Sequence, residues 1–313
     1  KGCSSAVGRL ASYTTNYPST GHLFFVPNPL SSHYPVGASR LSRRAARKEM
    51  DDLLQMEELG GRPATWLEAA QLEILEPIAE SVPMIGILAP DDEHVRPETL
   101  TAGLAKWLQD AGAKLRAGTA VDHLLLKNGQ ARAAVTAGGD EIEADAFVLA
   151  AGVCTRYLAE GLGKSIPLVG GKGYSLTYAG CTPSIKHPIY LSEAKVAISP
   201  YHGGVRLLGT MELGSQTDHI DRVRTDAMLR ACGRYLPHLS LTGEPTLWAG
   251  MRSMVPDGLP TIGRINGAPN VVVATAHAML GITLAPMTGE LVADIFEGRE
   301  LALFASAFSL DRF

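Results

Sequence analysis

The sequence predicts a protein of mixed class, in which an α/β region is combined with an α+β region. Residues 271–274 form a short β-branched run of the kind found in a parallel sheet that is covered on both faces, and residues 147–152 predict a second buried strand that ends in small residues. Residues 166–245 instead contain several strand-like runs separated by Gly and Pro, as in an antiparallel sheet, together with one helix. With 313 residues, the chain is long enough for one large two-part unit or for two domains.

Composition and charge exclude several classes of function. The formal net charge is −4 and the sequence contains no basic tract, so we expect no nucleic acid partner. No apolar run reaches the ~18 residues that a transmembrane helix needs. The cysteines lie far apart without a C-x-x-C pair, which argues against a disulfide scaffold or a zinc site: Cys3, Cys154, Cys181 and Cys232. Such usage fits a reducing cytoplasm, where we expect the protein, and a peripheral position at the inner membrane stays open.

The beginning of the chain carries the weakest pattern. Residues 13–37 are rich in Pro, Ser, Asn and aromatic residues and predict an extended loop. Residues 40–59 predict a charged helix with a partial apolar stripe. A further helix is expected from Thr65, as its cap, to Glu76, and a short strand at residues 85–88.

The next helix and hairpin have clearer boundaries. Pro97 favours a helix start and Gly112 a helix end. The stripe that we expect this helix to bury consists of Leu100, Leu104, Trp107, Leu108 and Ala111. Residues 114–126 predict a strand that returns as residues 131–137 through an Asn-Gly turn. The predicted strand 147–152 then ends in small residues, which allow a backbone or a ligand to approach closely.

The antiparallel region follows. Residues 172–177 predict one strand, and residues 196–200 and 205–212 predict a strand pair. Residues 222–236 have the spacing of a helix with one apolar face.

The last block, from residue 248 to residue 296, is the most informative. An arginine-bearing turn at residues 250–258 leads into a hairpin and then into the buried strand 271–274. A loop of small residues at 275–283 follows, before an amphipathic helix that runs through Phe296. Backbone N–H groups at such a helix start lack partners, and the helix dipole adds positive potential. We therefore expect this loop to hold an anion or a polarised oxygen.

Motifs in this block resemble a known family. They are G-M-R-x-M-x-P-D-G-x-P-x-I-G-R at residues 250–264, A-H-x-x-x-G-I-T at 276–283 and L-A-P-x-T-G at 284–289. Together they resemble the C-terminal signature of the FAD-dependent D-amino-acid oxidase superfamily, above all bacterial D-amino-acid dehydrogenases of the small-subunit type, followed by glycine and sarcosine oxidases. K-G-Y-S-L-T at residues 172–177 resembles a further family motif.

A segment near the start of the matched region departs slightly from the family. L-x-x-x-Q-L-x-x-x-E-P at residues 67–77 has Gln71 where glutamate is commoner in the family. The resemblance covers about residues 68–313. It implies a discontinuous FAD-binding domain of the two-dinucleotide-fold type and a substrate domain built on an antiparallel sheet. These domains would comprise residues 1–20, 85–165 and 246–313 for FAD, and 21–84 and 166–245 for substrate.

The family's N-terminal βαβ unit is absent from this sequence. That unit carries a G-x-G-x-x-G turn against the pyrophosphate, and no such motif occurs near the start. The sequence is a fragment of a longer enzyme, another chain supplies the unit, or the protein is a shortened relative that no longer holds FAD. We favour a missing or separately supplied unit, because the flavin-side motifs are intact. We predict that this chain alone binds FAD weakly or not at all.

The resemblance places several residues near FAD. Ser4 and Ser5 would lie near the pyrophosphate, with a solvent-exposed serine-rich terminus as the alternative. Val121 would lend its main chain to the adenine. Ala151 and Gly152 would run past the cofactor, although the residues alone equally fit tight packing of a strand against a helix.

The turn and loop of the last block would contact the other end of the cofactor. Gly250 frames the arginine-bearing turn and is assigned to the cofactor side. The residues expected at the pyrimidine edge of the flavin are Leu280, Gly281, Ile282 and Thr283. Their backbone N–H groups would stabilise the negative charge of the reduced flavin.

Arg252 is the first candidate for substrate binding. Its planar guanidinium suits the carboxylate of an amino acid, which it grips with two charge-assisted hydrogen bonds; a surface arginine that caps a turn is the alternative. Tyr174 is expected to donate its hydroxyl to substrate, unless it is a core tyrosine. A lone histidine such as His277 is more often structural than catalytic. No metal-ligand spacing is visible, and we expect no metal.

The activity implied by the resemblance is the oxidative deamination of D-amino acids to 2-oxo acids and ammonia. Hydride would pass from the substrate Cα to flavin N5, and the electrons would continue to a quinone or another acceptor. A glycine, sarcosine or D-proline type of amine oxidase is the alternative within the class. A hypothesis of another class is a non-catalytic relative that acts as a subunit.

Overall fold

The computed structural model describes residues 22–27, 51, 55, 64–79, 84–90, 93–201, 204–215, 217–301 and 303–313. The chain forms two compact units. Unit 1 comprises residues 1–111, 173–210 and 219–249, and unit 2 comprises residues 112–172, 211–218 and 250–313. Compactness thus groups residues 85–90 and 93–111 with unit 1, whereas we predicted residues 85–165 in the FAD-binding domain. The division into an FAD-binding and a substrate domain stays a prediction.

An eight-stranded sheet organises unit 1, with the strand order β14-β8-β12-β11-β10-β1-β3-β2. Its strands are β1 (His22–Pro27), β2 (Thr65–Leu67), β3 (Met84–Ala89), β8 (Val169–Tyr178), β10 (Ile189–Leu191), β11 (Val196–Tyr201), β12 (Gly204–Leu213) and β14 (Thr246–Met254). Pairing is antiparallel between β1 and β3 and from β10 to β12, whereas β1 and β10 run parallel. The predicted antiparallel region is therefore confirmed. Strands β8, β12 and β14 each begin in one unit and end in the other.

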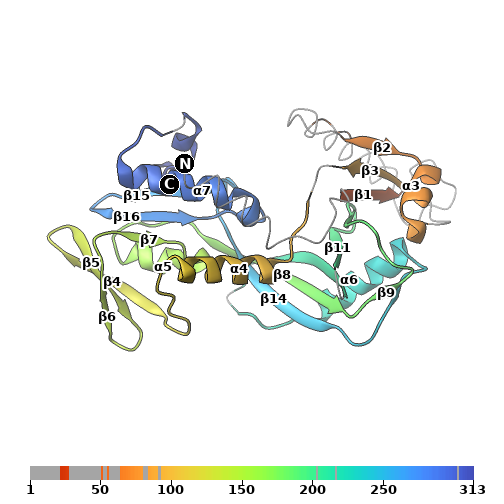
Figure 1. Ribbon diagram of the computed structural model, residues 1–313, viewed down its shortest axis with the longest axis horizontal. Helices are drawn as coiled ribbons and strands as arrows, with labels where there is room; N and C mark the ends of the chain where they lie inside the picture. Colours follow the sequence, from red (N-terminus) through yellow and green to blue (C-terminus); the bar gives the residue numbers. More distant parts are fainter. Residues whose placement is uncertain are drawn as a thin grey trace. The chain divides into compact units, whose positions relative to one another are not determined.

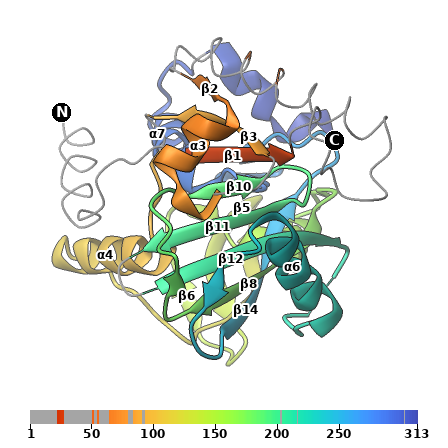
Figure 2. The ribbon, with the colours of Figure 1, turned by 90° about the vertical axis from the view of Figure 1, so that its right-hand side faces the viewer.

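Helix α6 (Arg222–Tyr235) covers one face of this sheet (Figure 2). Its start is capped by Asp221, whose carboxylate accepts a hydrogen bond from the N–H of Val223 at 2.8 Å. Burial of the apolar face of α6 against alternate strand residues forms the core of unit 1. The larger members of this core are Leu72, Ile78, Tyr174, Leu176, Ile189, Leu191, Ile198, Leu207 and Met228. A short pair, β9 (Cys181–Thr182) with β13 (Ser240–Leu241), completes the strands described in unit 1.

Glu76 is a fully buried carboxylate between α3 (Ala69–Leu75) and η1 (Pro77–Ala79). It accepts hydrogen bonds from the backbone N–H groups of Lys186 and His187, both at 3.0 Å. Nδ1 of His187 lies 3.1 Å from the same carboxylate. These partners satisfy a group whose burial would otherwise be costly, and they tie the start of unit 1 to the segment before β10.

Three secondary-structure predictions were made for the start of the chain. Two of them need correction, and most of the third lies outside the described residues. The predicted loop at 13–37 contains strand β1, because its apolar residues pair with β3 and β10. The helix expected from Thr65 is wrong: residues 65–67 form β2, and α3 begins after Glu68, which forms a capping box with Gln71. The helix expected at 40–59 lies outside the described residues, except for Asp51 and Gln55, which are helical.

Helix α4 (Pro97–Asp110) begins and ends close to the predicted residues. Pro97 occupies its first turn, where a missing N–H costs nothing. The predicted burial of its apolar stripe is wrong: in the part of the chain that the structure describes, α4 buries no residue. Leu108, for example, is 39% exposed.

The sheet of unit 2 has the order β15-β16-β7 (Figure 1). Strand β16 (Ala268–Thr275) pairs antiparallel with β15 (Thr261–Ile265) and parallel with β7 (Phe147–Leu149). Helix α7 (Gly281–Glu297) packs against β15 and β16. The centre of β16, Val271 to Val273, is completely buried, as its β-branched composition predicts.

Unit 2 contains a second three-stranded sheet, which is antiparallel throughout. It consists of β4 (Val121–Lys127), β5 (Gln130–Thr136) and β6 (Glu141–Glu143), and the Asn-Gly turn joins β4 to β5 as predicted. The strand expected from residue 114 starts only at Val121. The other elements are α5 (Thr155–Glu160), η2 (Gly152–Cys154), η3 (Leu303–Phe308) and η4 (Leu310–Arg312).

Helix α7 begins five residues before Pro286, so residues 281–283 form its first turn and the prediction of a loop there is wrong. Pro286 has no N–H, which leaves the carbonyl of Ile282 without the usual intrahelical donor. Among the described residues, no helix combines the length and the hydropathy needed to cross a bilayer.

Candidate active site

Arg252 lies near the end of β14, in unit 2, and is half-buried. Its Nη1 is completely buried, and among the described residues no atom accepts a hydrogen bond from it. Burial lowers the pKa of Arg252, although a guanidinium stays protonated at neutral pH. A buried cationic donor without an acceptor is costly, and a carboxylate placed beside it would remove that cost. The side chain is therefore not that of an arginine held in bulk water at a surface turn.

The residue after Arg252 joins this strand to the loop that follows β16. The hydroxyl Oγ of Ser253 accepts a hydrogen bond from the N–H of Ala276 at 3.2 Å. The carbonyl oxygen of Ser253 accepts one from the N–H of Ala278 at 3.0 Å. Within unit 2, the structure thus brings the predicted substrate strand, which is the end of β14 that carries Arg252, together with the predicted cofactor loop, residues 275–280.

The start of α7 has the properties expected of an anion site. Leu280 is the N-cap, and no side chain in the described structure caps the helix. The N–H groups of Gly281, Ile282 and Thr283 have no intrahelical acceptor, as in the first turn of any helix. All four residues are exposed, so these donors and the positive end of the helix dipole face outward. The correction of the helix start strengthens this part of the hypothesis.

His277 is tied to the helix rather than directed at a reacting group. Its Nε2 lies 2.8 Å from Oγ1 of Thr288, two turns into α7. Burial lowers the pKa of His277, so the imidazole is neutral at pH 7. This placement agrees with the expected structural role.

The end of β7 opens into a groove of about 810 Å³. Ala151 is exposed and Gly152 has φ 57°, and the Oγ1 of Thr275 donates to the carbonyl of Gly152 at 2.9 Å. Val121 lies in the same groove and is 40% exposed. The remaining lining residues are Thr119, Ala120, Asp122, Leu124, Ala134, Phe147, Val148, Leu149, Ala150, Cys154, Tyr157 and Leu158. Small residues at a strand end beside an open apolar groove fit the close approach of a dinucleotide.

The outer edge of β7 has no strand beside it in the described structure, because β7 pairs with β16 alone. Val148, at the centre of β7, is 46% exposed, which is unusual for a strand of this composition. The residues present therefore fit one side of an FAD site. The strand–turn–helix unit that would hold the pyrophosphate is not among the described residues.

Four predicted residues remain: Tyr174, Gly250, Ser4 and Ser5. Tyr174 is 1% exposed and belongs to the core of unit 1, which is the environment of a core tyrosine. Gly250 lies in β14, two residues before Arg252, and is partly exposed. Ser4 and Ser5 lie outside the described residues. Sequence reasoning missed Ser253 and Thr288, whose hydroxyl groups hold the cofactor loop.

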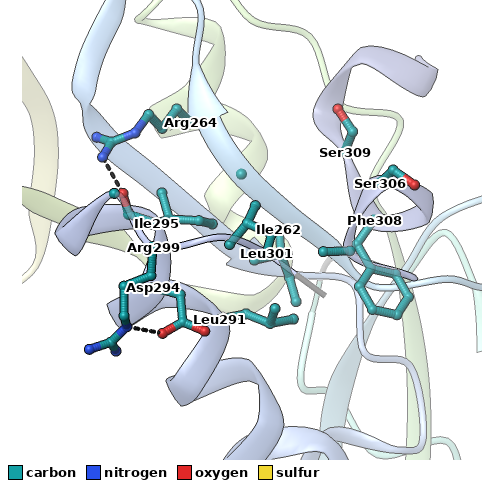
Figure 3. A pocket seen from close by; sticks show the side chains of 13 residues that line it. Ile262, Arg264, Leu291, Asp294, Ile295, Arg299, Leu301, Ser306, Phe308 and Ser309 are labelled. Atoms are coloured by element: carbon teal, nitrogen blue, oxygen red, sulfur yellow. Dashed lines mark hydrogen bonds and ion pairs between the residues drawn. The ribbon is translucent and has the colours of Figure 1, made fainter. Parts of the chain in front are cut away.

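A second cavity of about 680 Å³ lies at the other end of α7 (Figure 3). Leu291 and Ile295 line it from the helix and Ile262 from β15. The cations at its edge are already engaged: Arg299 pairs with Asp294 at 2.6 Å, and Arg264 donates to backbone carbonyls. Its lining starts ten residues after Gly281, about 15 Å along the helix, so this cavity is separate from the cofactor loop.

The described residues contain no cluster of three or more His, Cys, Asp or Glu side chains that could hold a metal ion.

A model of the FAD dependent oxidoreductase family, DAO, matches residues 14–295. The chain belongs to this family. FAD is therefore the cofactor of the family to which the chain belongs, and its members are oxidoreductases. The match includes β14, the cofactor loop and most of α7.

Solved structures share the fold of this family member. Glycine oxidase from Geobacillus kaustophilus is 23% identical with a TM-score of 0.83, and the match covers 99% of this chain and 80% of that one. L-proline dehydrogenase from P. horikoshii is 19% identical, with a TM-score of 0.76 and coverage of 99% and 81%. L-amino acid deaminase from Proteus vulgaris is 18% identical, with a TM-score of 0.76 and coverage of 100% and 83%.

Proposed function

We propose that the chain takes part in the FAD-dependent oxidative deamination of D-amino acids to 2-oxo acids and ammonia. The observation that carries this proposal is the buried Nη1 of Arg252, which lacks an acceptor among the described residues, on the strand that is bonded to the cofactor loop. A buried cation of this kind calls for an anionic ligand, and the carboxylate of an amino acid matches the fork of a guanidinium.

The residues of the chain have two tasks in this reaction. Arg252 holds the substrate carboxylate with two hydrogen bonds, which fixes the orientation of the Cα–H bond. The N–H groups of Gly281, Ile282 and Thr283 offer stabilisation for negative charge at the edge of the cofactor. FAD, when bound, supplies the two-electron oxidation of the amine carbon. We also propose a quinone or another acceptor for the electrons and, on the cysteine usage, a cytoplasmic location.

A variant of Arg252 tests the substrate site. Replacing Arg252→Ala removes two charge-assisted hydrogen bonds of about 1.5 kcal/mol or more each, which corresponds to a loss of about 150-fold or more in kcat/KM for a D-amino acid. Arg252→Lys retains the charge but not the fork, and we expect an intermediate loss. Arg299→Ala is the matched control, because Arg299 is an exposed arginine paired with Asp294 and Glu297. Unchanged turnover by Arg252→Ala would remove Arg252 from the site.

The choice of substrate is tested by a panel of amino acids. D-alanine, D-proline, glycine and sarcosine are compared, with oxygen or an artificial dye as the electron acceptor. We expect the highest kcat/KM with a D-amino acid. Preference for glycine or sarcosine would instead favour the alternative, a glycine, sarcosine or D-proline type of amine oxidase.

We further propose that the open edge of β7 receives a parallel strand from a nucleotide-binding unit outside the described residues, supplied by another chain or by another segment. The exposed Val148 and the adjoining groove support this partner. An FAD titration tests it: the 313-residue chain should show no bound flavin spectrum at stoichiometric FAD. A tightly bound flavin would contradict the need for such a unit.

The uncovered edge of β7 also favours a second class of function, a non-catalytic relative that acts as a subunit. Arg252 separates the two classes. If the chain is catalytic, Arg252→Ala lowers turnover. If it is a non-catalytic subunit, the complex that contains it turns over at the same rate with Arg252 or with Ala at this position.

A further inference from the structure

The loop between β16 and α7 has an unusual backbone. Ala276 has φ 64° and Ala278 has φ 48°, so two residues with a Cβ atom flank His277 in the left-handed region. Such conformations persist where the surrounding contacts determine the backbone more strongly than its own preference does. The loop is therefore held in place by its neighbours.

One of these neighbours is the substrate strand. Ser253 accepts hydrogen bonds from the N–H groups of both residues with positive φ. Its Oγ accepts from Ala276 at 3.2 Å, and its carbonyl oxygen accepts from Ala278 at 3.0 Å. Ala276 is completely buried, so water cannot replace the hydroxyl as an acceptor for its N–H. A single residue, directly after Arg252, thus fixes the loop from the side of the substrate.

The other neighbour is α7. Nε2 of His277 lies 2.8 Å from Oγ1 of Thr288, and the N–H of Leu280 donates to the carbonyl of His277 at 2.8 Å. At the beginning of the loop, the hydroxyl of Thr275 donates to the carbonyl of Gly152 at 2.9 Å. The imidazole therefore joins the loop to the helix whose first turn faces outward as an anion site.

We propose that Ser253 and His277 are positioning residues for the reaction proposed above, on which this inference rests. They hold residues 275–280 in one conformation and thereby fix the Arg252 strand and the first turn of α7 relative to each other. Arg252 orients the substrate carboxylate, and the N–H groups of residues 281–283 face the cofactor. A shift of about 1 Å between two such groups is enough to slow a reaction by about 100-fold.

Amide hydrogen exchange in the chain without cofactor tests whether these contacts hold residues 275–280 in one conformation, an arrangement called the lock below. We expect slow exchange of the Ala276 and Ala278 amides in the wild-type chain. Ser253→Ala removes the acceptor of the Ala276 N–H and should accelerate its exchange by about tenfold or more. Thr288→Val keeps the shape of the side chain without its hydroxyl and should accelerate both amides, whereas Thr288→Ser should retain protection.

A matched control is Ser215→Ala, which removes an exposed hydroxyl bonded to the carbonyl of Thr217 at 3.4 Å. Exchange of both amides should be unchanged in this variant. Equal exchange rates in the wild-type chain, Ser253→Ala and Thr288→Val would overturn the lock. This experiment needs neither cofactor nor substrate, so its result does not depend on the proposed function.

Turnover of the chain loaded with FAD, in the presence of the nucleotide-binding unit proposed above, separates positioning from a loss of stability. Ser253→Ala and Thr288→Val should each lower kcat by about 10-fold or more, with a change in KM of less than about threefold, because Arg252 still binds the carboxylate. Thr288→Ser should restore kcat. A raised KM at unchanged kcat, or no rescue by Thr288→Ser, would overturn the positioning role. If the wild-type chain, loaded with FAD in the presence of the nucleotide-binding unit, oxidises no amino acid, the proposed function fails and the positioning role with it, while hydrogen exchange still decides on the lock.

Discussion

Helices α4 and α6 have the same length, 14 residues each, and belong to the same compact unit, yet they are packed differently. Helix α6 is capped by Asp221 and buries Thr225, Met228, Cys232 and Tyr235. Helix α4 has no capping side chain and buries no residue in the described structure. Both carry apolar residues at helical spacing. The spacing therefore indicates which face of a helix suits a partner, but burial also requires a surface to receive that face.

The strongest test of this contrast is a truncation within the packed helix. Met228 is 1% exposed and packs in the core of unit 1. Met228→Ala removes its contacts and leaves a cavity, and we expect a loss of about 2–5 kcal/mol in the free energy of unfolding. Urea unfolding followed by circular dichroism measures this loss.

Met228→Leu is the control for this variant. It conserves the volume of the side chain, and its cost should stay below about 1.5 kcal/mol. If Met228→Ala cost less than about 1 kcal/mol, the face of α6 would not be packed as the structure shows, and the contrast with α4 would disappear.

The titration of Cys232 sharpens the comparison, because a buried thiol reports on the packing of α6. Burial raises the pKa of the Cys232 thiol from 9.0 to about 12. In the unfolded chain this thiol loses its proton at lower pH than in the folded one. Its contribution to stability is therefore complete below about pH 9 and falls as the pH rises toward 12, by about 1.4 kcal/mol per pH unit.

Urea unfolding under reducing conditions between pH 8 and pH 10 measures the onset of this fall, which amounts to about 1.4 kcal/mol over the whole window. The window ends where Tyr178, whose pKa is also raised, first by burial, begins to contribute. Cys232→Ala should leave only the loss contributed by Cys181, whose pKa burial also raises, whereas Cys154→Ala, at an exposed cysteine, should retain the full slope. An identical slope in all three chains would show that α6 does not shield Cys232.

Local pattern was sufficient for those parts of the fold in which short-range chemistry decides. The β-branched run in β16 predicted a buried strand, and Pro97 with Gly112 predicted the bounds of α4 within a residue or two. It was not sufficient at Thr65, where pairing with β3 places the residue in a strand. Nor could the pattern show that α4 stays uncovered, since that depends on surfaces distant in the sequence.

The candidate site shows the same division. Arg252 and residues 280–283 were predicted because they belong to motifs, and the structure brings their segments together through Ser253. Ser253 occupies a variable position of its motif, and Thr288, although it is the threonine of L-A-P-x-T-G, was assigned no role. A serine or threonine hydroxyl acquires its role only when the fold brings its partner near, here Ala276, 23 residues after Ser253, and His277, 11 residues before Thr288.

The smallest expected effect concerns α4 itself. Leu108 is 39% exposed, so Leu108→Ala removes a partly solvated side chain and leaves no closed cavity. We expect a loss of about 1 kcal/mol in the free energy of unfolding, and a change within about 0.5 kcal/mol for the neighbouring exposed control Gln109→Ala. Urea unfolding at several protein concentrations gives both values. If Leu108→Ala costs as much as Met228→Ala, or if its cost grows with protein concentration, a partner covers α4 in solution. The two helices would then differ only in the source of the covering surface, which is the chain's own sheet for α6 and another molecule for α4.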